Sequence, residues 1–367
     1  MAKIEHAQWH IGLAIADISA PPLDGLLDSS PETPLLNLLI AAIERISKES
    51  INALELISND NYWYIMLSIA RFLFVCLLWS QLGGEIICRR RSKRAIKILA
   101  PPLASDKLVE EIAKFATYAS IAYCDAQERI SNVRNVRNLR PAARLHAEIN
   151  VDDFQALVYF NPHDKEIVTA FRGAYGVFQF LFASSQEKVG YPGVPSATVT
   201  KSGWVAAMAI RDSVVTSLRE LKSRYPGYRL ILTGHSLGGV LATLMAPIVS
   251  QELSCAPETI RVITYNQLRV GNMVFADHYN SLAFNFTRVI NKQDPAGDHP
   301  EFDLGWAHVQ REVYVDTDNN FRQCSTHAIE DPACAFRKGS VFSPRHHSFV
   351  GKVKISRNGC DSFEIFP

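Results

Sequence analysis

The sequence predicts an α/β fold in which a mostly parallel central sheet is flanked by helices. From residue 95 onward, short apolar runs typical of buried strands alternate with longer amphipathic runs typical of helices. Such an alternation places helices on both faces of a parallel sheet. The chain has 367 residues, of which 47% are hydrophobic and 10% aromatic. This composition supplies a sizeable core and excludes intrinsic disorder.

The charge of the chain excludes a strongly basic nucleic-acid binder. Lys and Arg number 38 against 37 Asp and Glu, so the formal net charge is +1 at pH 7. The composition is nevertheless uneven along the chain. We divide it into an N-terminal extension over 1–65, a signal-like and propeptide-like segment over 66–94, and an α/β domain over 95–367.

The N-terminal extension carries no motif that suggests chemistry. It is rich in Pro and Leu and holds far more acidic than basic residues. The spacing of Ile40, Ile43 and Ile46 predicts one amphipathic helix over about 35–57. We expect the extension to lie outside the fold, with a role that the sequence does not define.

The most apolar run of the chain, 62–82, has three interpretations. Its only charged residue is Arg71, and a helix of this length spans a bilayer, although a central Arg is costly there. Starting at Met66, the same run has a short cationic start, an apolar block over 72–79 and a small-residue end, which is the layout of a secretory signal peptide. A buried core helix is the third interpretation.

A basic cluster follows this run and bears on the choice. The residues 91–94 resemble a dibasic propeptide processing site, so the signal interpretation predicts a secreted chain that begins near Ala95. As a membrane anchor, the run would place the domain in the cytosol, because basic flanking residues favour that side. We favour secretion, with an anchor through 62–82 as the alternative.

Hydrophobic periodicity predicts the elements of the domain. A first helix ends at Ala122, and a longer one is ended by Pro226. Two strand-like runs around the turn 161–164 predict a hairpin. The expected strands are 154–160, 166–171, 228–233, 260–265, 287–290 and 309–315, and the expected helices are 108–122, 206–221 and 240–250.

The strongest chemical signal is the pattern G-x-S-x-G over Gly234–Gly238, between a predicted apolar strand and a predicted helix. In this context the pattern is typical of a nucleophile elbow, a turn so tight that the serine is strained. Side chains two residues before or after Ser236 would collide with neighbouring backbone, which explains the glycines. The N-terminal amides of the following helix favour negative charge at the site.

A serine hydroxyl becomes a strong nucleophile when a base takes its proton and a carboxylate orients that base. Asp294 closes a strand-like run, which places it at the carboxyl edge where such sheets bind ligands. Asp298 and Asp303 are its competitors. Spacing alone does not choose the base among the downstream histidines, which are His299, His308, His327, His346 and His347.

Six segments together resemble the class 3 lipase family, the filamentous-fungal triacylglycerol lipases, over about residues 105–360. They are the strand ending in F-R-G at 167–173, S-G-W at 202–204, G-H-S-L-G-G at 234–239, the R-V-G-N region at 265–272, D-P to H-P at 294–300 and H-H-S-F at 346–349. The resemblance implies the α/β-hydrolase fold.

The resemblance also implies the roles of single residues. Ser236 is the nucleophile, Asp294 the orienting acid and His346 the base, with the neighbouring His347 as the alternative if the register shifts by one. The backbone amides of Ala174 and Leu237 form the oxyanion hole.

The chain departs from the family at two of these segments. The family has Ser or Thr where this chain has Ala174, so a hydroxyl donor is lost. Leu268 replaces a Pro, which we interpret as a change in packing.

The family's lid over the active site corresponds to 174–183 of this chain. Its apolar side chains are suited to lipid, because exposing them to water is unfavourable. A buried strand or helix is the alternative. The predicted lid and substrate residues are Val177, Phe178, Phe180, Leu181 and Phe182.

The cysteines bear on the compartment. The family's bridge between the first helix and the C-terminus implies a Cys124–Cys360 disulfide. Cys324 and Cys334 flank a short acidic loop and resemble a second pair. Of the five cysteines after residue 94, this leaves Cys255 unpaired, since Cys76 and Cys88 lie in the signal-like and propeptide-like segment. Disulfides persist in oxidising compartments, so both pairs favour secretion. The sequon at Asn285 is compatible with that route.

The resemblance implies a serine carboxylic-ester hydrolase, most simply a triacylglycerol lipase that works through an acyl-enzyme. Feruloyl or other aryl-ester hydrolysis and phospholipase A1 activity are alternatives on the same fold. A catalytically silent, lipid-binding or partner-binding scaffold is the alternative from another class. No cofactor or metal is implied. The expected partner is a lipid or other ester substrate, met at a lipid–water interface, with peripheral membrane contact and no nucleic acid.

Overall fold

The computed structural model describes residues 100–124, 143–175, 183, 185–326, 330–336 and 344–355. The extension 1–65, the segment 66–94, the predicted lid residues and Cys360 therefore lie outside the described residues. Within the described residues, no helix is both long enough and apolar enough to cross a membrane.

A central sheet organises the domain, and its strands follow the order β1-β2-β3-β6-β7-β8-β9-β10 among the described residues. Its middle is parallel, because β3, β6, β7, β8 and β9 pair in the same direction. The predicted fold class is confirmed. The parallel strands are β3 (Glu166–Phe171), β6 (Arg229–His235), β7 (Ile260–Tyr265), β8 (Asn285–Asn291) and β9 (Glu312–Val315).

Antiparallel strands close both edges of this sheet. The predicted hairpin is present as β2 (Phe154–Asn161) and β3, and β1 (Arg144–Val151) pairs with β2 outside it. At the other edge β10 (Phe321–Gln323) pairs with β9. Neither β1 nor β10 was predicted. Seven of the eight residues of β1 are exposed or partly exposed, so the strand lacks the apolar run that marks a buried one.

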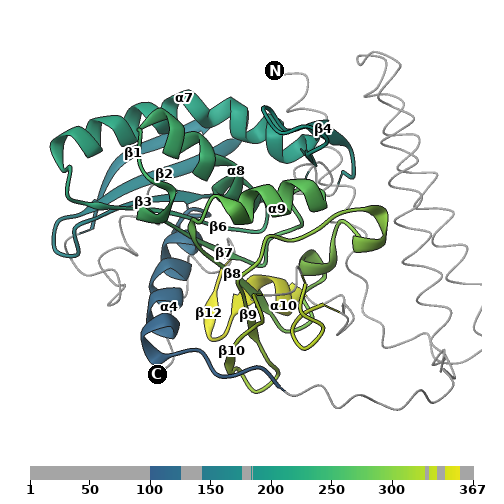
Figure 1. Ribbon diagram of the computed structural model, residues 1–367. Coiled ribbons are helices and arrows are strands. Elements are labelled where there is room, and N and C mark those ends of the chain that lie inside the picture. Colours follow the sequence, from purple (N-terminus) through teal and green to yellow (C-terminus); the bar gives the residue numbers. More distant parts are fainter. Residues whose placement is uncertain are drawn as a thin grey trace, which may run out of the picture. The chain divides into compact units, whose positions relative to one another are not determined.

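Helices cover both faces of the sheet, as Figure 1 shows. Helices α7 (Lys201–Arg224), α8 (Leu237–Glu252) and α9 (Met273–Ser281) contribute to one core together with Leu230 and Leu232 of β6. Helix α4 (Asp106–Ile121) contributes to a second core together with Ile231. Successive residues of a strand point to opposite faces, so β6 has both sides buried.

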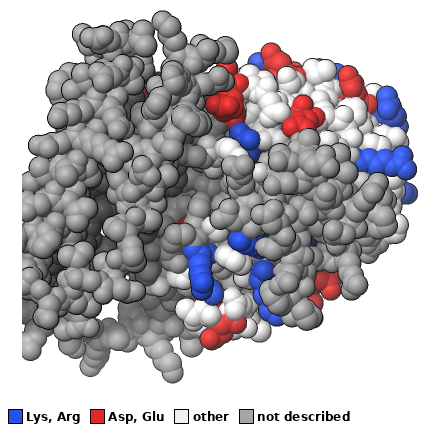
Figure 2. Space-filling view, turned by 180° about the vertical axis from the view of Figure 1, so that it is seen from behind, with Lys and Arg blue, Asp and Glu red and all other residues white. Residues whose placement is uncertain are grey.

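Short elements complete the described domain. They are the hairpins β4 (Lys188–Gly190) with β5 (Thr198–Thr200) and β11 (Phe349–Val350) with β12 (Val353–Lys354), the helix α10 (Pro344–Ser348), and the 3₁₀ turns Pro257–Thr259, Pro295–Asp298 and Phe302–Leu304. On the face in Figure 2, acidic and basic side chains lie interspersed over the described surface.

The carboxyl edge of the parallel strands brings three chain segments together. Strand β6 ends at His235, β7 at Tyr265 and β8 at Asn291. Parallel strands direct their carboxyl ends to the same edge, where ligands bind in sheets of this kind. The residues that follow these strands include Ser236 and Asp294, so the fold places the two predicted groups at one edge.

Candidate active site

Ser236 occupies a strained turn between β6 and α8. Its backbone has φ 57° and ψ −125°, a conformation that costs a non-glycine residue free energy. A Cβ atom at Gly234 would lie 2.1 Å from the carbonyl oxygen of Gly238, and one at Gly238 would lie 2.1 Å from that of Phe171. The turn 234–238, called the elbow below, therefore needs both glycines, as predicted.

A histidine and an aspartate lie in line with the Ser236 hydroxyl. The Nε2 atom of His347 is 3.1 Å from Ser236 Oγ. Its Nδ1 atom is 3.0 Å from both carboxylate oxygens of Asp294. A carboxylate accepts only, so Nδ1 carries the proton and Nε2 presents a lone pair to the hydroxyl. This is the arrangement in which a base takes the proton of a serine.

The assignment of the base to His346 is therefore corrected to His347, the alternative. Both residues lie in α10, and successive helical residues point about 100° apart, so only one of two neighbours can face Ser236. His346 instead contributes its backbone carbonyl, which accepts hydrogen bonds from Asn266 and Asn291. The sequence alone does not distinguish two adjacent histidines when the family motif fits either of them after a shift of one residue.

Asp294 is held in place on its other side. Its side chain caps the turn Pro295–Asp298 by accepting from the N–H of Ala296 at 3.1 Å, and the residue is 3% exposed. Of its two competitors, Asp303 is exposed, and Asp298 contributes its backbone carbonyl to Arg269. Neither has a described contact with the histidine that faces Ser236.

The base segment is fixed through its backbone. The Nδ2 atom of Asn266 donates to the carbonyl oxygens of His347 at 2.7 Å and of Phe349 at 3.1 Å. The carbonyl of His346 accepts from Asn291 at 3.0 Å. Asn266 directly follows β7, and Asn291 ends β8. Two asparagines at the carboxyl edge thus anchor the residues on either side of the imidazole.

The predicted oxyanion donors flank the elbow. Leu237 is the first residue of α8, and the first N–H groups of a helix have no intrahelical acceptor. The segment that leads to Ala174 packs against the elbow, because a Cβ atom at Gly173 would lie 2.6 Å from the carbonyl oxygen of His235. Both amides are therefore available near Ser236, and their role remains a prediction.

A buried ion pair supports the loop after Asp294. The guanidinium of Arg269 meets the carboxylate of Glu330 with two N–O distances of 2.6 Å, and it also donates to the carbonyl of Pro300 at 2.8 Å. Both side chains are almost fully buried.

The cysteine predictions have different outcomes. The disulfide Cys324–Cys334 is confirmed and encloses the loop that carries Glu330. Cys124 is disulfide-bonded, and Cys360, its predicted partner, lies outside the described residues. Cys255 is free and partly exposed.

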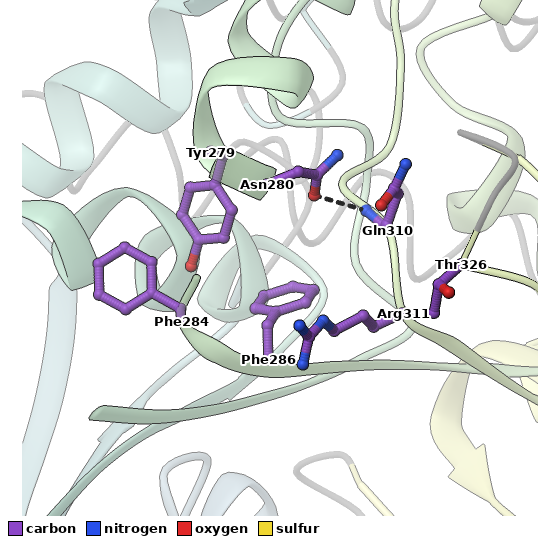
Figure 3. A pocket seen from close by; sticks show the side chains of 7 residues that line it. All are labelled: Tyr279, Asn280, Phe284, Phe286, Gln310, Arg311 and Thr326. Carbon is purple, nitrogen blue, oxygen red and sulfur yellow. Dashed lines mark hydrogen bonds between the residues drawn. The ribbon is translucent and has the colours of Figure 1, made fainter. Parts of the chain in front are cut away.

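A cavity of about 220 Å³ lies away from this site. Figure 3 shows the rings of Tyr279, Phe284 and Phe286 on one side of it, with Gln310 and Arg311 on the other. Because β8 begins at Asn285, these aromatic residues lie at the amino edge of the sheet, opposite the edge that carries Ser236. The cavity is thus distinct from the candidate active site.

The residues that surround the base were missed by the sequence reasoning. Asn266 and Asn291 each end or follow a strand, but an asparagine at a strand end is too common to signal a role. His235 lies inside the elbow motif and was given none. Its imidazole Nε2 is 2.7 Å from the carbonyl oxygen of His347.

Comparisons with known proteins relate the chain to lipases. Residues 168–303 match the family described as lipase (class 3). The chain is 25% identical to a lipase of Rhizomucor miehei over 236 residues, which is 64% of this chain and 61% of the relative. It is 26% identical to the secreted mono- and diacylglycerol lipase A of Penicillium cyclopium over 175 residues, 47% of this chain and 56% of the relative. The matches thus span less than two thirds of either relative.

A solved structure shows the same fold. It is a triacylglycerol lipase whose catalytic centre is described as a serine protease triad. The alignment has a TM-score of 0.64 and 22% identity, and it covers 71% of this chain and 99% of that chain. The described domain therefore has the α/β-hydrolase fold.

Proposed function

Because residues 168–303 match the class 3 lipase family, we propose that this chain is a serine carboxylic-ester hydrolase that acts on acylglycerols. The observation that carries the proposal is the line of three side chains at the carboxyl edge. His347 lies within hydrogen-bond distance of both the Ser236 hydroxyl and the Asp294 carboxylate. The relatives named above are lipases, which supports an acylglycerol as the substrate.

The reaction begins with the attack of Ser236 Oγ on the ester carbonyl carbon. His347 Nε2 accepts the hydroxyl proton as the new O–C bond forms, and Asp294 stabilises the resulting imidazolium. The carbonyl oxygen becomes an oxyanion, which receives hydrogen bonds from the amides of Ala174 and Leu237. No cofactor takes part in this sequence of steps.

The tetrahedral intermediate then collapses. The bond to the leaving alcohol breaks, and the alkoxide takes the proton from His347, which leaves an acyl-enzyme on Ser236. Water repeats the steps in the second half: His347 removes its proton, the hydroxide attacks the acyl carbon, and the carboxylic acid departs as Ser236 regains its proton.

Secretion is part of the proposal. The Cys324–Cys334 disulfide and the bonded Cys124 support it, because disulfides persist in oxidising compartments. The Penicillium relative is named as secreted. N-terminal sequencing of material from a secretory host tests it: a start near Ala95 is expected, and activity that stays with membranes after carbonate washing contradicts it.

A serine-directed probe tests the proposed chemistry. A fluorophosphonate should label the wild-type chain at Ser236, and Ser236→Ala should abolish both labelling and hydrolysis of p-nitrophenyl butyrate. Labelling that persists in the variant would contradict the assignment. A wild-type chain that takes no label would instead favour the silent lipid-binding scaffold. Comparing triacylglycerols, feruloyl esters and phospholipids then identifies the substrate class.

A further inference from the structure

His235 lies between the base and the first helix. The residue is 3% exposed, and its ring centroid is 4.6 Å from that of His347 and 5.8 Å from that of Tyr123. Its Nε2 atom is 2.7 Å from the carbonyl oxygen of His347, and its Nδ1 atom is 2.8 Å from the hydroxyl of Tyr123. Both ring nitrogens of a buried imidazole are therefore occupied.

These contacts permit one arrangement of protons. The carbonyl of His347 can only accept, so Nε2 of His235 carries a proton and donates it. Burial lowers the pKa of His235 well below its usual range, and the ring is neutral. Its Nδ1 atom must then be an acceptor, and the Tyr123 hydroxyl donates to it. The hydroxyl thus satisfies Nδ1 in the tautomer through which His235 holds the base segment.

Tyr123 joins a third segment to the pair. Its hydroxyl lies against the backbone of Gly173, and burial raises the pKa of this hydroxyl, so it keeps its proton. A Cβ atom at Gly173 would lie 2.0 Å from that hydroxyl oxygen, so the close approach requires glycine. The next residue is Ala174, whose amide is a proposed oxyanion donor.

A continuous series of contacts therefore links two halves of the site. It runs from the backbone of Gly173, which packs against the Tyr123 hydroxyl, through the two hydrogen bonds of the His235 ring to the carbonyl of His347. One end sets the position of the base, and the other sets the segment that carries an oxyanion donor. Pre-organised geometry of this kind lowers barriers, and a displacement of about 1 Å can cost about 10²-fold in rate.

We propose that His235 and Tyr123 are positioning residues, which hold the base His347 and the oxyanion segment at Gly173–Ala174 in one fixed relation. The inference rests on the proposed function, because it concerns the same reaction. Both side chains are buried, so the role that we assign them is positioning rather than contact with the substrate. In the proposed reaction His347 becomes positively charged. A neutral His235 permits this, whereas a charged His235 at this ring separation would repel the imidazolium of His347.

Kinetics of p-nitrophenyl butyrate hydrolysis test the proposal in three variants. Tyr123→Phe keeps the ring but removes the hydroxyl, and His235→Leu removes both hydrogen bonds at similar volume. Each should lower kcat by roughly 10- to 100-fold with little change in KM, because geometry rather than binding is lost. His235→Gln can still donate to His347, so it should recover most of kcat.

The matched control is Tyr118→Phe. This variant removes another buried hydroxyl, near the C-terminal end of α4, without touching His235. It should leave kcat unchanged. Wild-type kcat in both Tyr123→Phe and His235→Leu would overturn the proposal. An inactive wild-type chain would instead count against the proposed function.

A spectroscopic measurement does not depend on activity. In the wild-type chain labelled with ¹⁵N-histidine, NMR at pH 7 should show His235 as the neutral Nε2–H tautomer. In Tyr123→Phe the Nδ1 resonance of His235 should shift, because this nitrogen loses its hydrogen-bond donor, whether or not the variant hydrolyses esters. A protonated His235, or the Nδ1–H tautomer in the wild-type chain, would overturn the proposal even if His235→Leu failed to fold.

Discussion

Glu330 and Arg269 form a buried two-point ion pair, with Nε–Oε1 and Nη2–Oε2 distances of 2.6 Å each. Arg269 also donates to the backbone carbonyls of Asp298 and Pro300. These carbonyls belong to the loop that follows Asp294. The pair therefore ties a disulfide-enclosed loop to the segment that follows Asp294, the carboxylate of the proposed triad.

Removing one partner of this pair should destabilise the domain strongly. Glu330→Gln leaves the Arg269 charge buried without its carboxylate, and such losses cost about 3–5 kcal/mol. Urea unfolding measures the change. The matched control is Glu187→Gln, which breaks an exposed pair with Lys201 and should have no measurable effect. Equal free energies of unfolding for the two variants would contradict a strong contribution of the buried pair to stability.

Loss of the Cys324–Cys334 disulfide should also destabilise the domain. The bridge closes a loop with a sequence separation of 10, which in the chain-entropy model stabilises the domain by about 3 kcal/mol. The double variant Cys324→Ser with Cys334→Ser should lower the free energy of unfolding by about that amount. Cys255→Ser, which removes a free thiol, is the control and should unfold like the wild-type chain.

The elbow should tolerate no side chain at Gly238. A Cβ atom there meets the Phe171 carbonyl at 2.1 Å, so Gly238→Ala must displace backbone next to Ser236. We expect a loss of about 1–3 kcal/mol in stability and a severe loss of kcat. Gly227→Ala is the control, because nothing lies within 4 Å of its added Cβ. A variant at Gly238 with wild-type kcat would contradict the steric account.

Buried histidines should make the domain acid-sensitive. Burial lowers the pKa of His308 and of His235 well below the usual value, so each stays neutral in the folded chain. Below about pH 6.5 the unfolded chain binds protons that the folded chain does not. The free energy of unfolding should therefore fall as the pH decreases, by about 1.4 kcal/mol per pH unit for each histidine.

A variant isolates one of these contributions. His308→Gln can still donate to the carbonyl of Gly297, which His308 Nε2 contacts at 2.7 Å, but it cannot take up a proton. Between pH 6 and pH 5 its free energy of unfolding should fall less steeply than that of the wild-type chain. Identical slopes in urea titrations at both pH values would show that His308 already binds a proton when folded.

The elements predicted best from the sequence were those with local causes. The elbow could be predicted because its steric demands lie within five residues, and the strands β6, β7 and β8 because burial on both faces makes them apolar runs. Strand β1 escaped prediction because only one of its eight residues is buried, so it forms no apolar run.

Features fixed by long-range packing could not be predicted. The choice between His346 and His347 depends on how α10 is rotated against the sheet, which Asn266 and Asn291 determine from distant strands. The contacts of His235 likewise join residues more than a hundred positions apart. The spacing of residues in a single sequence carries no information on such contacts.

The most direct test of the account compares His347→Ala with His346→Ala in the rate of fluorophosphonate labelling at Ser236. The assigned triad predicts that His347→Ala lowers this rate by a factor on the order of 10³ or more, because the hydroxyl loses its base. His346→Ala keeps the backbone carbonyl that Asn266 and Asn291 bind and should label close to the wild-type rate. The reverse order of the two variants would contradict the central claim.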